Sequence, residues 1–279
     1  DSIRVTLLGY SPVTKVANGA EMNISLSPSD FQLDEVVVSE GVNHLSSVAA
    51  VDIATTPVNS SQELLRKVPG LFIGQHAGGG KAEQLFLRGF DLDHGTDINI
   101  SVDGMPVNMV SHAHGQGYAD LHFLIPELVE KIDFDKGPYH ADKGNLATAG
   151  YVAFRTKDRL ENSSLTLEGG KFNTFKGLGL INLVNDAKQA AYLAGSYIKT
   201  DGPFEASQDF KRLKLMGKYT RSFNNLDRLS FSAMHFNSSW LASGQIPQRA
   251  VDEGLISRFG AIDANEGGKT SRTNLNLQY

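Results

Sequence analysis

Residues 211–221 alternate two kinds of side chain in strict order. The apolar or small ones are Leu213, Leu215, Gly217 and Tyr219, and the polar ones between them are Arg212, Lys214, Lys218 and Thr220. Successive side chains of a strand point to opposite faces, so this stretch predicts a strand with one apolar and one charged face. A sheet built from such strands needs an apolar medium on one side and polar partners on the other.

The same alternation recurs on both sides of this stretch. It predicts further strands over Leu165 to Gly169, Phe175 to Leu183, Ala191 to Tyr197, Leu229 to Ala233, and Leu275 to Tyr279. Several approach the roughly 9–11 residues that cross a bilayer when tilted. Aromatic residues lie at or near the strand ends, as in an interfacial girdle: Tyr197, Tyr219, Phe223, Phe236 and Tyr279. A transmembrane β-barrel and a soluble antiparallel sheet both remain open.

No window approaches the roughly 18–20 consecutive apolar residues of a membrane-spanning helix, which excludes an α-helical membrane protein.

The connections Asn185 to Lys188 and Ser222 to Asp227 are predicted to be short, and Thr200 to Phe210 and Asn237 to Arg272 to be long. Such alternation is typical of outer-membrane barrels, although the short Gly170 to Thr174 departs from it. Trp240, in the last long connection, is interpreted as an anchor. Because six strands cannot close a barrel, further strands are expected after Tyr279.

Residues 59–157 have a mixed pattern. Ser60 or Ser61 can cap a helix that runs to Lys67, and a second helix is predicted to start within Pro126 to Glu130. Strands are predicted over Leu71 to Gln75, Gln84 to Arg88, Ile98 to Val102, Lys131 to Phe134 and Tyr151 to Arg155. These elements predict a small α+β domain.

The first 58 residues are simpler. Ile3 to Leu8 and Met22 to Leu26 predict a β-hairpin, and residues 31–58 look like a linker that contains the valine run 36–38.

The net charge of -5, with Lys and Arg spread along the chain, argues against a nucleic-acid partner. The absence of cysteine excludes disulfides and thiolate metal sites.

Four motifs in residues 60–157 carry a family resemblance. They are SQELLRKVPG (61–70), LRGF (87–90), VDGMP (102–106) and LVEKIDFDKGP (128–138). Their order and spacing before alternating strands resemble the plug and early barrel of a TonB-dependent outer-membrane receptor. The sequence departs from the usual pattern near the end of the plug, where Asp142-Lys143-Gly144 and Ala149-Gly150 replace a tyrosine-glycine and a double glycine.

The resemblance extends upstream. LDEVVVS (33–39) is similar to the TonB box of Bacteroidetes-type receptors, and residues 1–30 resemble the last strands of a carboxypeptidase-regulatory-like β-sandwich. The implied fold is an α+β plug domain (59–157) followed by antiparallel transmembrane β-barrel strands of an incomplete barrel (158–279). A short all-β remnant (1–30) and a TonB-box linker (31–58) precede it.

The resemblance implies a transporter and not an enzyme, without a cofactor. Its function would be TonB-dependent, energy-coupled import of a nutrient across the outer membrane of a Gram-negative cell, with the plug and N-terminal segment reached from the periplasm. The ligand would be a metal chelate such as a siderophore, a glycan or a peptide. Implied partners are the TonB complex, outer-membrane lipid, the imported ligand and a lipoprotein lid.

The implied energy-coupling residues are Asp34, Glu35, Val36, Val37 and Val38. Their backbone can add as a strand to a sheet edge of the TonB partner; the alternative is a plain domain linker. A second set is interpreted as structural positions of the plug, in preference to acid/base catalysts: Arg88, Gly89, Asp103, Gly104, Pro106, Glu130, Lys131, Gly137 and Pro138.

The histidines form a third set. Six of the eight lie between His76 and His140. We hypothesise that the ligand path is lined by His112, His114, Gln116, Tyr118 and His122; the alternative is that these imidazoles are hydrogen-bonded fillers. His112 and His114 would point to the same side of an extended chain, but two histidines without a third ligand make a weak metal site.

Two other functional classes stay open. His-x-His also occurs in metal-dependent hydrolases, although neither a βα repeat nor a second His pair accompanies it here. The strands after residue 158 could also form a soluble β-sandwich that serves binding or adhesion.

Overall fold

The computed structural model describes residues 2–5, 13–16, 24–27, 58, 60–75, 79–92, 94–113, 115–223, 227–242 and 244–279. They belong to two compact units, Asp1–His44 and Leu45–Tyr279. In the first unit, strand β1 (Ser2–Val5) pairs antiparallel with β2 (Val13–Val16). The prediction of a strand from Met22 to Leu26 is wrong, because residues 24–27 form no strand. The Val-Thr-Lys-Val run of β2 has higher β-propensity and closes a shorter loop with β1.

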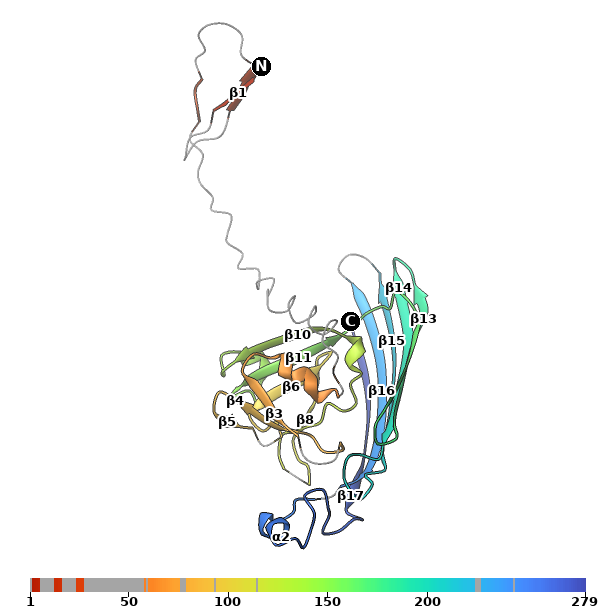
Figure 1. The fold of residues 1–279 in the computed structure, drawn as a ribbon. Coiled ribbons are helices and arrows are strands. Elements are labelled where there is room, and N and C mark those ends of the chain that lie inside the picture. The colour runs from red at the N-terminus through yellow and green to blue at the C-terminus, as the bar shows by residue number, and fades with distance from the viewer. Residues whose placement is uncertain are drawn as a thin grey trace. The chain divides into compact units, whose positions relative to one another are not determined.

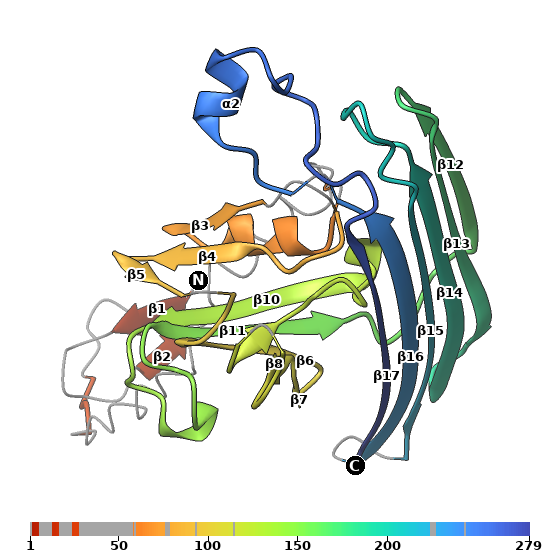
Figure 2. The same cartoon turned by 90° about the horizontal axis from the view of Figure 1, so that it is seen from below.

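A six-stranded antiparallel sheet forms the C-terminal part of the second unit, with its strands in sequence order. We call it the strand wall: β12 (Ser164–Gly170), β13 (Thr174–Asn185), β14 (Gln189–Thr200), β15 (Phe210–Ser222), β16 (Arg228–Leu241) and β17 (Gly267–Gln278). The wall curves alongside the rest of the unit (Figures 1 and 2). None of the helices in the described residues combines the length and apolar character that a bilayer crossing requires.

The two faces of the strand wall have inverted polarity. Leu193 and Leu215 on the outer face are 48% and 46% exposed, whereas Lys214 and Lys218 on the inner face are both 6% exposed. The predicted alternation of residues 211–221 is therefore confirmed, and its charged face is the buried one. A soluble sheet buries the apolar face instead.

The last long connection is shorter than predicted. Strand β16 continues to Leu241 and β17 starts at Gly267, so the connection spans 242–266 and contains a short helix α2 (Gln248–Asp252). The prediction that Trp240 lies in a loop is wrong, because it is part of β16. Side chains 237–239 are polar on both faces, so the period of two that reveals a strand is lost there.

The remainder of the second unit is the central domain, the described residues between 58 and 157. Its largest sheet has the order β10-β11-β6-β7, in which β11 and β6 are parallel. These strands are β6 (Ile98–Val102), β7 (Met105–Pro106), β10 (Val129–Lys136) and β11 (Gly150–Thr156). Two smaller sheets consist of β3 (Leu71–Gly74), β4 (Gln84–Leu87) and β5 (Phe90–Asp91), and of β8 (Asn108–Met109) and β9 (Tyr118–Ala119).

The helices of the central domain are single 3-10 turns or little more: η1 (Gln62–Lys67), η2 (Pro126–Leu128) and η3 (Ala141–Lys143). The first predicted helix is present as η1. The second prediction is wrong beyond Leu128, because Val129 begins β10. Strand pairing with β11 runs along the whole of β10 and outweighs the weak local preference for a helix.

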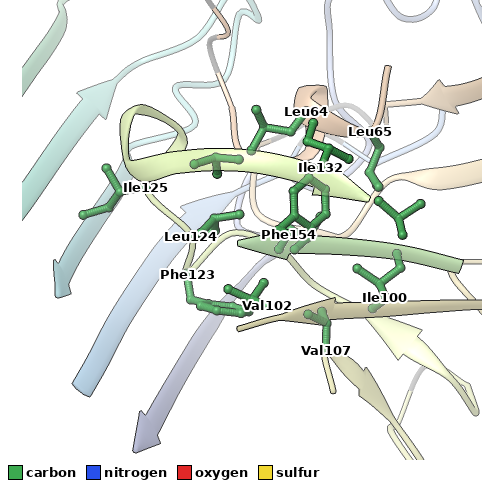
Figure 3. Close-up of a cluster of buried hydrophobic side chains, with 14 of the residues drawn as sticks. Leu64, Leu65, Ile100, Val102, Val107, Phe123, Leu124, Ile125, Ile132 and Phe154 are labelled. Atoms are coloured by element: carbon green, nitrogen blue, oxygen red, sulfur yellow. The ribbon is translucent and has the colours of Figure 1, made fainter. Parts of the chain in front are cut away.

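One hydrophobic cluster joins the central domain to the strand wall. In the central domain it contains Leu64 and Leu65 of η1, Ile100 of β6 and Phe154 of β11, as Figure 3 shows. The same cluster includes wall residues of β14 to β16: Tyr192, Ala194, Met216, Met234 and Phe236. Shared burial of apolar area therefore packs the two parts as one body.

Candidate functional site: the interface between the central domain and the strand wall

Strand β15 presents three cations to the central domain. Arg212, Lys214 and Lys218 are 5–6% exposed and lie on the inner face at even positions. A buried charge is costly unless polar partners surround it. Each of the three reaches oxygen atoms of the central domain, and these contacts determine how the domain is seated.

Lys214 holds the beginning of the central domain. Its ammonium donates hydrogen bonds to the Ser61 hydroxyl at 2.6 Å and to the Leu124 carbonyl at 2.8 Å. The Ser61 hydroxyl in turn donates to the same carbonyl. Ser61 immediately precedes η1, and Leu124 lies just before η2. One wall cation therefore joins two segments that are 63 residues apart in the chain.

Lys218 holds the end of the central domain. It donates to the Thr156 hydroxyl at 2.9 Å and carbonyl at 3.2 Å, and its ammonium lies 3.1 Å from Asp158 and 3.5 Å from Asp103. Burial alone would raise the pKa of Asp158, but Arg228 and Lys218 lower that pKa below its ordinary value. Two carboxylates and two oxygens of Thr156 thus surround one ammonium.

Asp103 contributes to this seat with both its side chain and its backbone. The carboxylate accepts hydrogen bonds from the Thr156 amide at 2.8 Å and hydroxyl at 2.6 Å. The carbonyl accepts from the side chains of Asn276 (2.8 Å) and Gln278 on β17. Asp103 and Gly104 have φ of 47° and 75°, so the Asp-Gly pair forms a turn in a region that Asp and Gly tolerate. The turn touches two strands of the wall at once.

Arg212 meets a glycine loop of the central domain. Its guanidinium donates to the Gly79 carbonyl and lies 4.9 Å from the centre of the Phe210 ring. The Trp240 ring covers Gly80 so closely that a Cβ there would overlap it. Glycine at 79 and 80 lets the backbone approach the wall, and the Trp240 ring packs on this loop of the central domain.

This contact can be tested with a matched pair of variants. Gly80→Ala is expected to destabilise the interface by about 1–3 kcal/mol, because the Trp240 ring or the loop must move. Gly115→Ala is the control, since no heavy atom of the described residues lies within 4 Å of a Cβ built there. Urea midpoints followed by circular dichroism would compare the two; equal midpoints would contradict the contact.

A group of titratable side chains lies behind Arg212. His122 Nε2 is 3.8 Å from Glu83 Oε1, and His122 Nδ1 is 2.8 Å from Asp120 Oδ1. Burial raises the pKa of Glu83 to about 7. Burial, assisted by the charge of Arg212, lowers the pKa of His122 to about 4. Burial opposes ionisation of Asp120, but contacts with His122 lower its pKa overall.

The described ligand-path residues differ in their surroundings, although Tyr118 lies within the electrostatic reach of Asp120 and Glu83, the two partners of His122. The His112 ring stacks on Tyr118 with centroids 4.1 Å apart, and the Tyr118 hydroxyl accepts a hydrogen bond from the Ala82 amide at 2.8 Å. Burial raises the pKa of Tyr118 to about 12. Gln116 is exposed, whereas His122 is buried beside Asp120 and Glu83.

His114 and the segment Asp34 to Val38 lie outside the described residues. Within the described ranges, no three side chains of His, Cys, Asp or Glu are placed to hold a metal ion. The remaining motif residues lie at turns and edges. Arg88 and Gly89 form the turn before β5, both with positive φ, and Gly137 has a φ of 92°. Glu130 and Lys131 are exposed on β10. The carbonyl of Pro106 accepts a hydrogen bond from the Arg272 guanidinium.

Sequence reasoning missed several members of the interface. Glu83, Asp120 and Arg272 belong to no motif, and the partners of Lys214 lie more than 80 residues away. The signal that could have found the wall residues was the charged face of 211–221, because charges between apolar residues of a strand require polar partners.

Comparison with known proteins gives consistent matches. The model of the TonB-dependent Receptor Plug Domain matches residues 38–151. The vitamin B12 transporter BtuB of Vibrio vulnificus is 24% identical over 242 residues, which are 82% of this chain and 37% of that protein. The chain therefore spans well under two thirds of the length of this relative.

Two solved structures share the fold. The unliganded ferric citrate transporter FecA matches with a TM-score of 0.65 at 16% identity, over 81% of this chain and 35% of FecA. The siderophore receptor PirA from Acinetobacter baumannii matches with a TM-score of 0.56 at 17% identity, over 82% of this chain and 36% of PirA. Because each match covers about four fifths of this chain, it includes residues of both the central domain and the strand wall.

Proposed function

We propose that this chain, a TonB-dependent receptor of the outer membrane, imports a nutrient ligand by energy-coupled release of its plug, with the central domain as the plug and the strand wall as part of the barrel. The observation that carries the proposal is the row of three buried cations on β15, each bonded to plug oxygens. A polar interface seats the plug firmly, yet it can be solvated again by water when the plug moves.

The inverted polarity of the strand wall supports the same function. Its outer face exposes apolar side chains such as Ile181 and Leu275, at 50% and 69%, to which lipid is the matching solvent. Its inner face supplies polar groups to the plug. A plug with this seat closes the lumen of a wide barrel, so passage requires a change of the plug.

We propose a metal chelate as the ligand class. Relatives named for ferric citrate, ferric enterobactin, copper and vitamin B12 support this class. Glycans and peptides are the alternative, and a lipoprotein lid would accompany a glycan. The described members of the proposed ligand path are the stacked pair His112 and Tyr118, exposed Gln116 and buried His122.

Coupling is proposed to run through Asp34 to Val38. Strand addition to a TonB partner uses backbone N–H groups, and a proline removes one of them. Val37→Pro is therefore expected to reduce uptake to the level of a deletion strain, whereas Val37→Ala keeps the N–H and retains uptake.

Uptake would be measured with radiolabelled ferric citrate, ferric enterobactin, copper and cyanocobalamin in cells that carry each variant. Surface binding of the imported compound should be equal in the two variants. Uptake by the proline variant at the wild-type rate would contradict coupling through this segment. Failure of every compound to accumulate, with growth restored by a glycan or peptide, would overturn the chelate proposal.

A further inference from the structure

The two buried lysines of β15 hold opposite ends of the plug. They lie on the same face of one strand, four positions apart, and both are 6% exposed. Lys214 bonds to Ser61 and Leu124, whereas Lys218 bonds to Thr156 and pairs with Asp158. Nearly 100 residues of plug separate Ser61 from Thr156 in the chain. The start and the end of the plug are therefore bonded to the wall by two different lysines.

The two ends differ in how they are tied to the wall. Thr156 and Asp158 are followed within a few residues by β12, so the chain itself keeps them beside the wall. Ser61 has no such covalent tie. It follows the linker that contains Asp34 to Val38, so a force applied to that linker reaches Ser61 before the rest of the plug.

The chemistry of the two contacts also differs. The partners of the Lys214 ammonium are a hydroxyl and a carbonyl, and among the described residues no carboxylate lies within ion-pair distance of it. The Lys218 ammonium is paired with two carboxylates, Asp103 and Asp158. The attraction between opposite charges adds to the hydrogen bonds at Lys218 and is absent from the neutral partners of Lys214. The weaker contact is thus the one at the free end.

We propose that Lys214 is the release contact of the plug: its bonds to Ser61 and Leu124 keep the free end closed and are the first wall bonds to break when the linker is drawn away. Lys218 is the permanent anchor and stays bonded. This assignment rests on the proposed function, because it concerns how the proposed coupling force is received. Lys214 is a positioning residue and touches no ligand.

Residues 1–279 contain no cysteine, so a thiol can be placed in the linker without removing one from this part of the receptor. In a receptor whose remaining sequence is also free of cysteine, or made so by serine substitution, and which is folded in a lipid bilayer disc, Ser39→Cys provides one thiol for a DNA handle. Optical tweezers then pull the linker at constant force. The measured quantity is the rate of the first rupture. Lys214→Met and Lys218→Met are matched variants, since both remove one buried ammonium from the same face of β15.

Lys214→Met is expected to raise the first-rupture rate about tenfold or more, because a buried hydrogen bond to a charged group exceeds the free energy of a tenfold rate ratio. Lys218→Met should leave this rate within about twofold, although both variants lower the heat-unfolding midpoint. If Lys214→Met does not fold, Ser61→Ala is expected to raise the rate in the same way and leaves the barrel unchanged.

An unchanged rate in the Lys214 or Ser61 variant, or an equal acceleration by Lys218→Met, would overturn the assignment. The handle is covalent, so the result does not depend on binding to TonB. Uptake lost in Val37→Pro with no effect of Lys214→Met would refute only the release contact. An accelerated rupture together with normal uptake in Val37→Pro would refute only the coupling.

Discussion

Replacing Asp103 with alanine is expected to lower the free energy of unfolding of the plug by about 3–5 kcal/mol. The substitution takes one carboxylate from the buried Lys218 ammonium and leaves the Thr156 amide and hydroxyl without their acceptor. The Asp103 side chain is only 6% exposed, so water cannot replace it fully. Urea titration of the receptor would measure the loss. Trp240 is the single tryptophan of residues 1–279, and in a receptor without other tryptophans its fluorescence reports on the interface through its contact with Gly80.

Asp103→Asn is the matched control for backbone conformation. Asparagine tolerates the positive φ of 47° at this position and can still accept one hydrogen bond from Thr156. Its loss of stability should therefore be clearly smaller than that of alanine. Equal losses for both variants would mean that the charge of Asp103 is what matters, and no loss for alanine would contradict the role of this turn as a seat.

The buried pair Glu83 and His122 is expected to give two variants with opposite pH dependence. Glu83 has a pKa of about 7 in the folded protein and of 4.5 in the unfolded chain. Between these two pH values the folded protein keeps the Glu83 proton, whereas the unfolded chain has lost it. Stability from Glu83 therefore falls as pH rises from about 4.5 to about 7. The pKa of His122 is lowered from 6.5 to about 4, so its contribution rises between about pH 4 and 6.5.

In the wild type the two contributions nearly cancel between about pH 4.5 and 6.5. Glu83→Gln removes the falling term, and the free energy of unfolding should then rise by about 3 kcal/mol across this range relative to the wild type. His122→Asn removes the rising term, and stability should fall relative to the wild type by a similar amount. Urea titrations at closely spaced pH values would give both difference curves. If both differences in free energy of unfolding changed in the same direction with pH, the opposite pKa shifts of Glu83 and His122 would be refuted.

The alternation of residues 211–221 was enough to predict both the strand and its two faces. It could not reveal the partners of the charged face, because Ser61 and Leu124 come from distant turns that carry no signal of their own. The residue pair Asp103-Gly104 is typical of a turn, because Asp and Gly tolerate the positive φ that both adopt here. Its contacts to β17 depend on tertiary packing alone.

The histidine cluster shows a different limit. Spacing along an extended chain placed His112 and His114 on one side, but a prediction of this kind assumes that the backbone stays extended. In the structure His112 stacks on Tyr118 and His122 is buried beside Asp120, whereas His114 lies outside the described residues, so the shared side of His112 and His114 stays a prediction. Helix prediction failed at Glu130 for a similar reason, because pairing with β11 overrode the local preference.

The inverted faces of β15 also bear on how its sequence can vary. At an outward position such as Leu215, contact with lipid requires only that the side chain is apolar, so isoleucine, valine, methionine and phenylalanine should all be tolerated. At the neighbouring Lys214, the Ser61 hydroxyl and the Leu124 carbonyl are fixed in position, so only a side chain with a hydrogen-bond donor at the end of a chain as long as that of lysine can reach both. The number of acceptable amino acids should therefore alternate from one residue to the next, so that random mutagenesis of this strand would give a profile of tolerance with a period of two.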